Sequence, residues 1–408
     1  MLLFVFEIDP HPIACVPVLD TSHPGPDYTL RWPRELFVLE SKALRELVLS
    51  NKAEWNRGVE WLLTEAFVAD VPADDFREAS QGFLRSSDVW ASTPAKLGRI
   101  GTKPETLFLQ DLISAAERLP EEHSPRPYYA ARVSSRSSEA AHRDSPDLAA
   151  AQRDWLREVA LIQNRGYLDR VAPRPCVDDD FPGLQDQDLK LDEVIAERLG
   201  EAGLWWPRPE VWDEQTFYSL IEVFHDLVAR PRDRWLHNFN GCGWHYERFA
   251  PYPAQVLYRW TVNRMLKRHG IDLILTKSGE DTGRLAHRVD EGRQDLIDSA
   301  LDAPDQERRV SVSHAIALFR SRNAGRDEKR SACTVLASLL EERRALLKSE
   351  LFKKDEGALF QIANEFAIRH RDAKQHPEYD DAYLDWIFWW YLSTIELTDK
   401  LVRRQTDG

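Results

Sequence analysis

Residues 381–392 read Asp-Ala-Tyr-Leu-Asp-Trp-Ile-Phe-Trp-Trp-Tyr-Leu, and this stretch decides the fold of the C-terminal quarter of the chain. It belongs to a helix predicted from Ala382 to about Arg404, whose side chains between Trp386 and Leu392 are apolar on nearly every face. A single bundle cannot bury every face of one helix. We therefore expect this helix either to form a homodimer interface or to pack against the middle of the chain.

Three more helices are predicted upstream by apolar residues that recur at helical spacing. The first begins near Arg308, the second is capped by Asp327, and the third is capped by Asp355. Short turns join the four helices, which favours an antiparallel four-helix bundle over residues 301–408. The expected fold class is mainly α, with a minor β component near the N-terminus from the apolar run at residues 2–8.

The third predicted helix ends in a polar cluster, where residues 364–376 read Asn-Glu-Phe-Ala-Ile-Arg-His-Arg-Asp-Ala-Lys-Gln-His. Arg369 and His370 continue the buried stripe of that helix, whereas Arg371 and His376 have less structural reason to be there. An arginine near a helix C-terminus interacts favourably with the helix dipole, worth about 0.3–1 kcal/mol. That interaction accounts for one arginine. It explains less well why Arg369, His370, Arg371 and His376 cluster together.

The charge around this cluster differs from that of the whole chain. Residues 307–376 hold 15 Lys or Arg against 10 Asp or Glu, a local net charge of +5 in a chain whose total is −14. The acidic total should repel nucleic acid, so a nucleic-acid ligand would need a local basic patch. This basic region could bind a phosphate ligand. Alternatively, it is an ordinary helix face exposed to solvent.

Size and composition indicate a globular protein of two or three domains, with 408 residues of which 43% are hydrophobic and 30% charged. The four cysteines lie far apart without a CxxC pair, which argues against a zinc knuckle or a disulfide framework and fits a reducing cytoplasm. We found no Gly-rich phosphate loop, signal peptide or membrane-spanning run, so neither cofactor nor membrane is expected.

The rest of the chain divides by composition into three regions. We expect an α+β or mainly helical domain over residues 1–120, a linker with one helix over 121–186, and an aromatic-rich domain over 187–300. Helices are predicted in these regions at residues 54–67, 147–165, 191–199, 214–228 and 256–267, and a short β-hairpin at 271–287.

Within the aromatic-rich region, the stretch from Trp235 to Tyr246 resembles a loop that contains two glycines. His237 and His245 could bind a metal here. We favour a packed aromatic loop with hydrogen-bonded histidines, because no acidic or cysteine partner has the spacing of a known metal site.

Residues 301–408 resemble the HEPN superfamily, small helical bundles common in bacterial antiphage, abortive-infection and toxin systems. The pattern of that family is an arginine and a histidine separated by four to six residues, the first of which is usually polar. Arg371 fits the four-residue spacing to His376, and Arg369 fits the six-residue spacing. The sequence departs from the pattern in that two arginines compete for one role and Pro377 directly follows the histidine.

The resemblance implies metal-independent RNA cleavage without a cofactor. His376 would transfer a proton, and Arg369 or Arg371 would bind the phosphate and stabilise charge in the transition state. The auxiliary residues would be His370, Asp372 and Asn364. Active sites of this family commonly form across a two-fold dimer, in agreement with the homodimer expected from the aromatic helix.

Three functions are therefore open. The leading one is a cytoplasmic, bacterial defence or toxin-type ribonuclease acting on an RNA substrate, with residues 1–300 sensing or restraining the nuclease. The alternative is a non-catalytic HEPN-like dimerisation protein whose aromatic middle region binds a partner protein of a defence system. The third is an enzyme centred on Trp235–Tyr246, with Glu247 and the two histidines.

Overall fold

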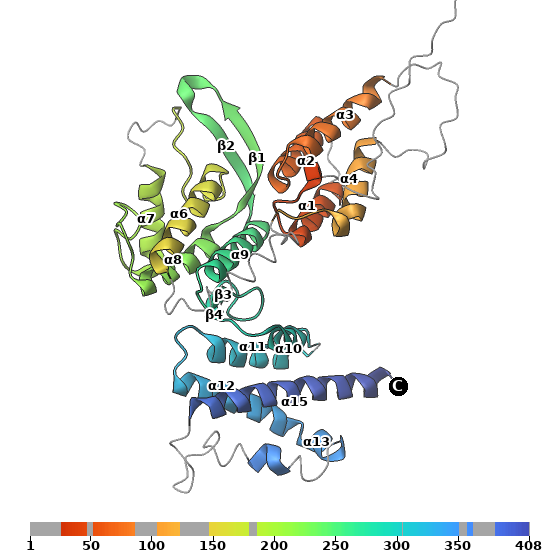
Figure 1. Cartoon of the computed structure of the whole chain (residues 1–408), viewed down its shortest axis with the longest axis vertical. Coiled ribbons are helices and arrows are strands. Elements are labelled where there is room, and N and C mark those ends of the chain that lie inside the picture. The colour runs from red at the N-terminus through yellow and green to blue at the C-terminus, as the bar shows by residue number, and fades with distance from the viewer. Residues whose placement is uncertain are drawn as a thin grey trace, which may run out of the picture. The chain divides into compact units, whose positions relative to one another are not determined.

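The computed structural model describes residues 26–46, 52–85, 104–122, 147–178, 186–303, 305–350, 357–361 and 380–407. These residues are mainly helical and contain two small antiparallel sheets, which confirms the expected fold class (Figure 1). The run at residues 2–8, expected to form a strand, lies outside the described residues. Among the described residues, no helix combines the length and apolar character needed to cross a membrane.

The chain forms two compact units, Met1–His142 and Arg143–Gly408. In its described part the first unit is helical, and α2 confirms the helix predicted at residues 54–67. Its core gathers aromatic rings, with the ring centroids of Phe37 and Phe67 5.2 Å apart. The helices of this unit are η1 (Pro26–Tyr28), α1 (Arg34–Glu46), α2 (Lys52–Ala66), α3 (Val71–Arg85), α4 (Pro104–Ala115) and η2 (Ala116–Arg118).

The second unit begins with helices that pack around Trp155, which is fully buried. Four aromatic rings lie within 6.0 Å of its ring centroid, and its indole N–H donates to the Tyr258 hydroxyl at 2.9 Å. These aromatic contacts form the core of the first helices of the unit. The helices are α6 (Leu148–Asn164), α7 (Gln187–Leu199), α8 (Glu214–Leu227) and α9 (Pro251–Arg268), and every end lies within five residues of the predicted bound.

Two β-hairpins interrupt the helices: β1–β2 joins α8 to α9, and β3–β4 joins α9 to the C-terminal helices. Strands β3 (Leu273–Leu275) and β4 (Leu285–His287) pair antiparallel, which confirms the hairpin predicted at residues 271–287. Strands β1 (Arg230–His237) and β2 (Gly243–Ala250) also pair antiparallel, joined by η3 (Phe239–Gly241). The prediction of a loop from Trp235 to Tyr246 was therefore wrong, because Asn240, Gly241 and Gly243 only turn the chain between two long strands.

The C-terminal helices share one apolar core. Phe319 and Phe388 stack in it with ring centroids 3.8 Å apart. The helices are α10 (Glu291–Leu301), α11 (Gln306–Arg320), α12 (Arg326–Glu342), α13 (Arg344–Glu350) and α15 (Asp381–Asp407). The helix predicted after Asp355 is described only at residues 357–361. On α15 the apolar residues divide into a buried face with Phe388 and an exposed one with Trp386, which is 50% exposed.

Candidate metal centre

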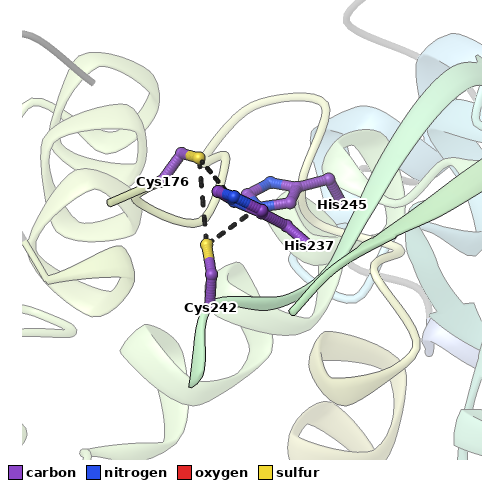
Figure 2. Close-up of side chains that lie close together, drawn as sticks. All are labelled: Cys176, His237, Cys242 and His245. Carbon is purple, nitrogen blue, oxygen red and sulfur yellow. Dashed lines mark hydrogen bonds between the residues drawn. The ribbon is translucent and has the colours of Figure 1, made fainter. Parts of the chain in front are cut away.

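Four metal-binding side chains meet at the outer end of the β1–β2 hairpin: Cys176, His237, Cys242 and His245. Their ligand atoms all lie within 4.8 Å of one another. Figure 2 shows the two thiols and the two imidazole rings directed toward a common point. All four residues are half-buried. Two sulfurs and two ring nitrogens are a donor set typical of zinc.

The hairpin positions three of these ligands. His237 ends β1, Cys242 lies in the turn, and His245 is in β2 directly opposite Trp235. The turn is compact because Gly241 and Gly243 adopt positive φ angles, and the Cys242 N–H donates to the Phe239 carbonyl at 3.1 Å. The Trp235 ring stacks on the His245 ring with centroids 4.5 Å apart, which limits the orientations open to the imidazole.

The segment after α6 supplies the fourth ligand. Helix α6 ends in a Schellman motif, in which Gly166 has a φ of +77° and the Tyr167 N–H donates to the Ile162 carbonyl at 3.0 Å. The chain then turns back along the hairpin. Gly166 lies against the Tyr246 ring, and the Arg174 guanidinium lies 5.2 Å from the centroid of that ring. These contacts bring Cys176 to the hairpin across 66 positions of sequence from Cys242.

The distances between donor atoms suit a tetrahedral cage. Zinc–sulfur bonds of about 2.3 Å and zinc–nitrogen bonds of about 2.0–2.1 Å imply sulfurs ~3.8 Å apart and sulfur–nitrogen pairs ~3.6 Å apart. The two Sγ atoms are 3.8 Å apart. Cys176 Sγ lies 3.4 Å from His237 Nδ1, and Cys242 Sγ lies 3.0 Å from His245 Nε2. The four residues therefore fit a zinc ion with small adjustments.

A carboxylate supports one of the histidines from outside the cage. Asp178 Oδ2 lies 3.4 Å from Nε2 of His237, the ring nitrogen that faces away from Cys176. A carboxylate on the second nitrogen fixes the tautomer of a metal-binding histidine and raises its basicity. His237 would therefore bind the metal through Nδ1 and donate its Nε2 proton to Asp178.

The local electrostatics disfavour negative charge when no cation is present. The Asp178 N–H lowers the pKa of the Cys176 thiol, but desolvation and the adjacent Cys242 outweigh it, so the pKa is raised overall. Burial likewise raises the pKa of the nearby Asp169 carboxyl, against the effect of Arg174. A divalent cation reverses this balance, because a coordinating thiol is deprotonated. Metal binding would therefore release the proton of the Cys176 thiol.

With four protein ligands the cage is closed, since no position is left for water or a substrate. Closed Cys₂His₂ sites are structural, whereas catalytic zinc sites keep one position open. Glu247, the acid of the third hypothesis, instead accepts the Trp235 indole N–H at 2.9 Å. The geometry therefore favours a metal that holds the hairpin to the segment after α6.

The residues that the sequence singled out for RNA cleavage are Arg369, Arg371 and His376, with His370, Asp372 and Asn364 as auxiliaries, and all six lie outside the described residues. Sequence reasoning considered His237 and His245 but missed Cys176 and Cys242. The spacing His-x₄-Cys-x₂-His from 237 to 245 was an available signal. No family model, curated protein or solved structure matches the chain.

Proposed function

We propose that Cys176, His237, Cys242 and His245 bind one Zn²⁺ ion, which fastens the β1–β2 hairpin to the segment following α6. The observation that carries this proposal is the convergence of two sulfurs and two ring nitrogens within 4.8 Å of one another, with the sulfurs 3.8 Å apart as in a tetrahedral zinc site. The cysteines described are free thiols. Thiol ligands for zinc persist in a reducing compartment, so we propose a cytoplasmic location.

Purified protein is expected to contain about one zinc ion per chain by elemental analysis, because the cage offers four ligands and no competing geometry. Cys242→Ala is expected to lose most of this zinc, since three ligands bind far more weakly than four. Cys333→Ala is the matched control, because Cys333 is a buried thiol in the C-terminal core, away from the cage. Zinc-free wild-type protein that takes up no added Zn²⁺ would contradict the proposal.

We further propose, as a function of the whole chain, a metal-independent ribonuclease of the HEPN type that acts as a homodimer in antiphage defence. Support comes from the Arg-x₄-His spacing of Arg371 and His376, and from the packing of α11, α12 and α15 around a common core next to that motif in sequence. The zinc centre would then be structural and separate from the cleavage chemistry. A non-catalytic dimerisation protein is the second candidate, favoured by the exposed face of α15.

Replacing His376 by Ala is expected to reduce RNA cleavage by roughly 100-fold or more, because the general acid–base group is lost. Arg371→Ala and Arg369→Ala, tested singly, identify which arginine binds the phosphate. His314→Ala is the control: this exposed histidine on α11 pairs with Glu280 and should leave cleavage unchanged. If the wild-type dimer and His376→Ala cleave RNA equally, the cleavage does not depend on this motif and the HEPN proposal fails. If neither cleaves RNA, the non-catalytic function is the better description.

A further inference from the structure

The two sulfur ligands of the metal centre lie next to each other. Cys176 Sγ and Cys242 Sγ are 3.8 Å apart, and Figure 2 shows this contact between the segment after α6 and the turn of the β1–β2 hairpin. A disulfide bond holds its sulfurs at about 2.0 Å, so an approach of about 2 Å would join the two side chains. The pair that binds the metal is therefore also close to a covalent cross-link.

The turn that carries Cys242 has room for this approach. Gly241 and Gly243 flank Cys242 with positive φ angles, and a Cβ at either position would have no described atom within 4 Å. Phe239, at the start of the same turn, is 67% exposed. The described residues thus leave open space around the turn, which can shift with little repacking.

Both sulfur ligands are accessible to a small oxidant. Cys176 and Cys242 are half-buried, whereas Cys333 is fully buried in the C-terminal core. Burial raises the pKa of the Cys333 thiol to about 12, so this thiol stays protonated. A metal-bound cysteine is instead a thiolate, which is the form that reacts with peroxides. Among these three cysteines, oxidation should therefore select the two in the metal centre.

We propose that the metal centre is a redox switch, in which hydrogen peroxide joins Cys176 and Cys242 in a disulfide and releases the zinc ion. The inference rests on the zinc centre proposed above and adds its regulation. In the first step one thiolate attacks a peroxide oxygen, the O–O bond breaks, and a sulfenic acid and a hydroxide form. In the second step the other thiolate attacks the sulfenic sulfur, and the S–O bond breaks to release a second hydroxide. Two electrons pass from the sulfurs to the peroxide, and two protons from the solvent convert the hydroxides to water.

The disulfide replaces the metal as the link between the hairpin and the segment after α6. Because the thiolate is the zinc ligand, oxidation leaves only His237 and His245, and two ring nitrogens bind zinc far more weakly than four ligands. The new bond closes a loop across 66 positions of sequence, and cross-links that close long loops restrict the unfolded chain most. The oxidised hairpin thus stays attached while the metal leaves.

The experiment treats reduced, zinc-loaded, full-length protein with hydrogen peroxide and follows two products in the same samples. A colorimetric chelator measures released zinc against samples without peroxide, and non-reducing peptide mapping by mass spectrometry locates any disulfide. We expect loss of all bound zinc, with one ion released for each Cys176–Cys242 disulfide. Dithiothreitol followed by fresh Zn²⁺ should restore both thiols and the zinc content.

Two cysteine variants serve as controls. Cys333→Ala removes the buried thiol, and Cys15→Ala removes the cysteine that lies outside the described residues. Both variants should release zinc and form the disulfide as wild type does, because neither cysteine belongs to the metal centre.

Zinc content before oxidation separates the failure of the switch from the failure of the metal centre. Protein that binds zinc but keeps its zinc and both thiols under peroxide would overturn the switch and leave the metal centre intact. Zinc release with sulfinic acids in place of the disulfide, or with a disulfide that includes Cys15 or Cys333, would also overturn the switch. Reduced protein that binds no zinc would refute the metal centre and the switch together.

Discussion

Removing the metal with a chelator is expected to open the outer half of the β1–β2 hairpin while helices α6, α8 and α9 remain folded. The two regions differ in what holds them. The helices bury Trp155, Phe217 and Phe224 completely. The outer hairpin instead exposes most of its side chains, and the metal would hold its three ligands to Cys176. Loss of the ion should therefore produce local rather than global unfolding.

Hydrogen exchange read by mass spectrometry measures this directly. With free Zn²⁺ at 100 times its Kd, binding stabilises the closed state by about 2.7 kcal/mol, so peptides covering residues 235–246 should exchange roughly 100-fold faster after chelation. Peptides from α8 (Glu214–Leu227) serve as the internal reference and should change little. Equal exchange with and without chelator at residues 235–246 would show that the hairpin needs no metal.

The second large effect is expected from Gly166→Ala. A Cβ at this position would lie 2.4 Å from Cδ2 of Tyr246, far inside van der Waals contact, and the residue also has a φ of +77°. Left-handed backbone costs an alanine about 1–2 kcal/mol, and overpacking adds about 1–3 kcal/mol. The Tyr246 ring must move away, which separates the hairpin from Cys176, so zinc affinity should fall together with stability.

Gly200→Ala isolates the contribution of the backbone. Gly200 ends α7 with a φ of +76°, nearly that of Gly166, but a Cβ there would have no atom within 4 Å. Urea unfolding should show Gly200→Ala destabilised by about 1–2 kcal/mol with normal zinc affinity. Indistinguishable values for the two variants would mean that the Tyr246 contact does not hold the hairpin in place.

The helices were the most predictable part of this chain, because helical periodicity is a local property. Helix α8, for example, was expected at residues 214–228 and is observed at Glu214–Leu227, where Asp213 caps it by accepting the Thr216 N–H. The β3–β4 hairpin was also predictable, since a glycine-containing turn separates two apolar runs.

The β1–β2 hairpin and its metal centre were not predicted. Strand β1 contains Arg232, Asp233 and Arg234, so it lacks the apolar alternation of a half-buried strand and resembled a loop. The pairing of Cys176 with Cys242 depends on how α6 ends and where Tyr246 rests, which are tertiary contacts that no local pattern encodes. The proposed ribonuclease residues are the opposite case, because a sequence motif identifies them and they lie outside the described residues.

The placement of the four ligands along the chain has a consequence for the order of folding. Three ligands occur between residues 237 and 245, so a partial cage can assemble within one hairpin at small entropic cost. Cys176 lies 61 positions before His237, and its arrival closes a loop that contains α7 and α8. Loop-closure entropy opposes this step, rising by about 0.6 kcal/mol for each doubling of loop length. Completion of the cage should therefore follow the docking of α7 and α8. A metal ion bound by all four ligands would then indicate that these two helices have already docked.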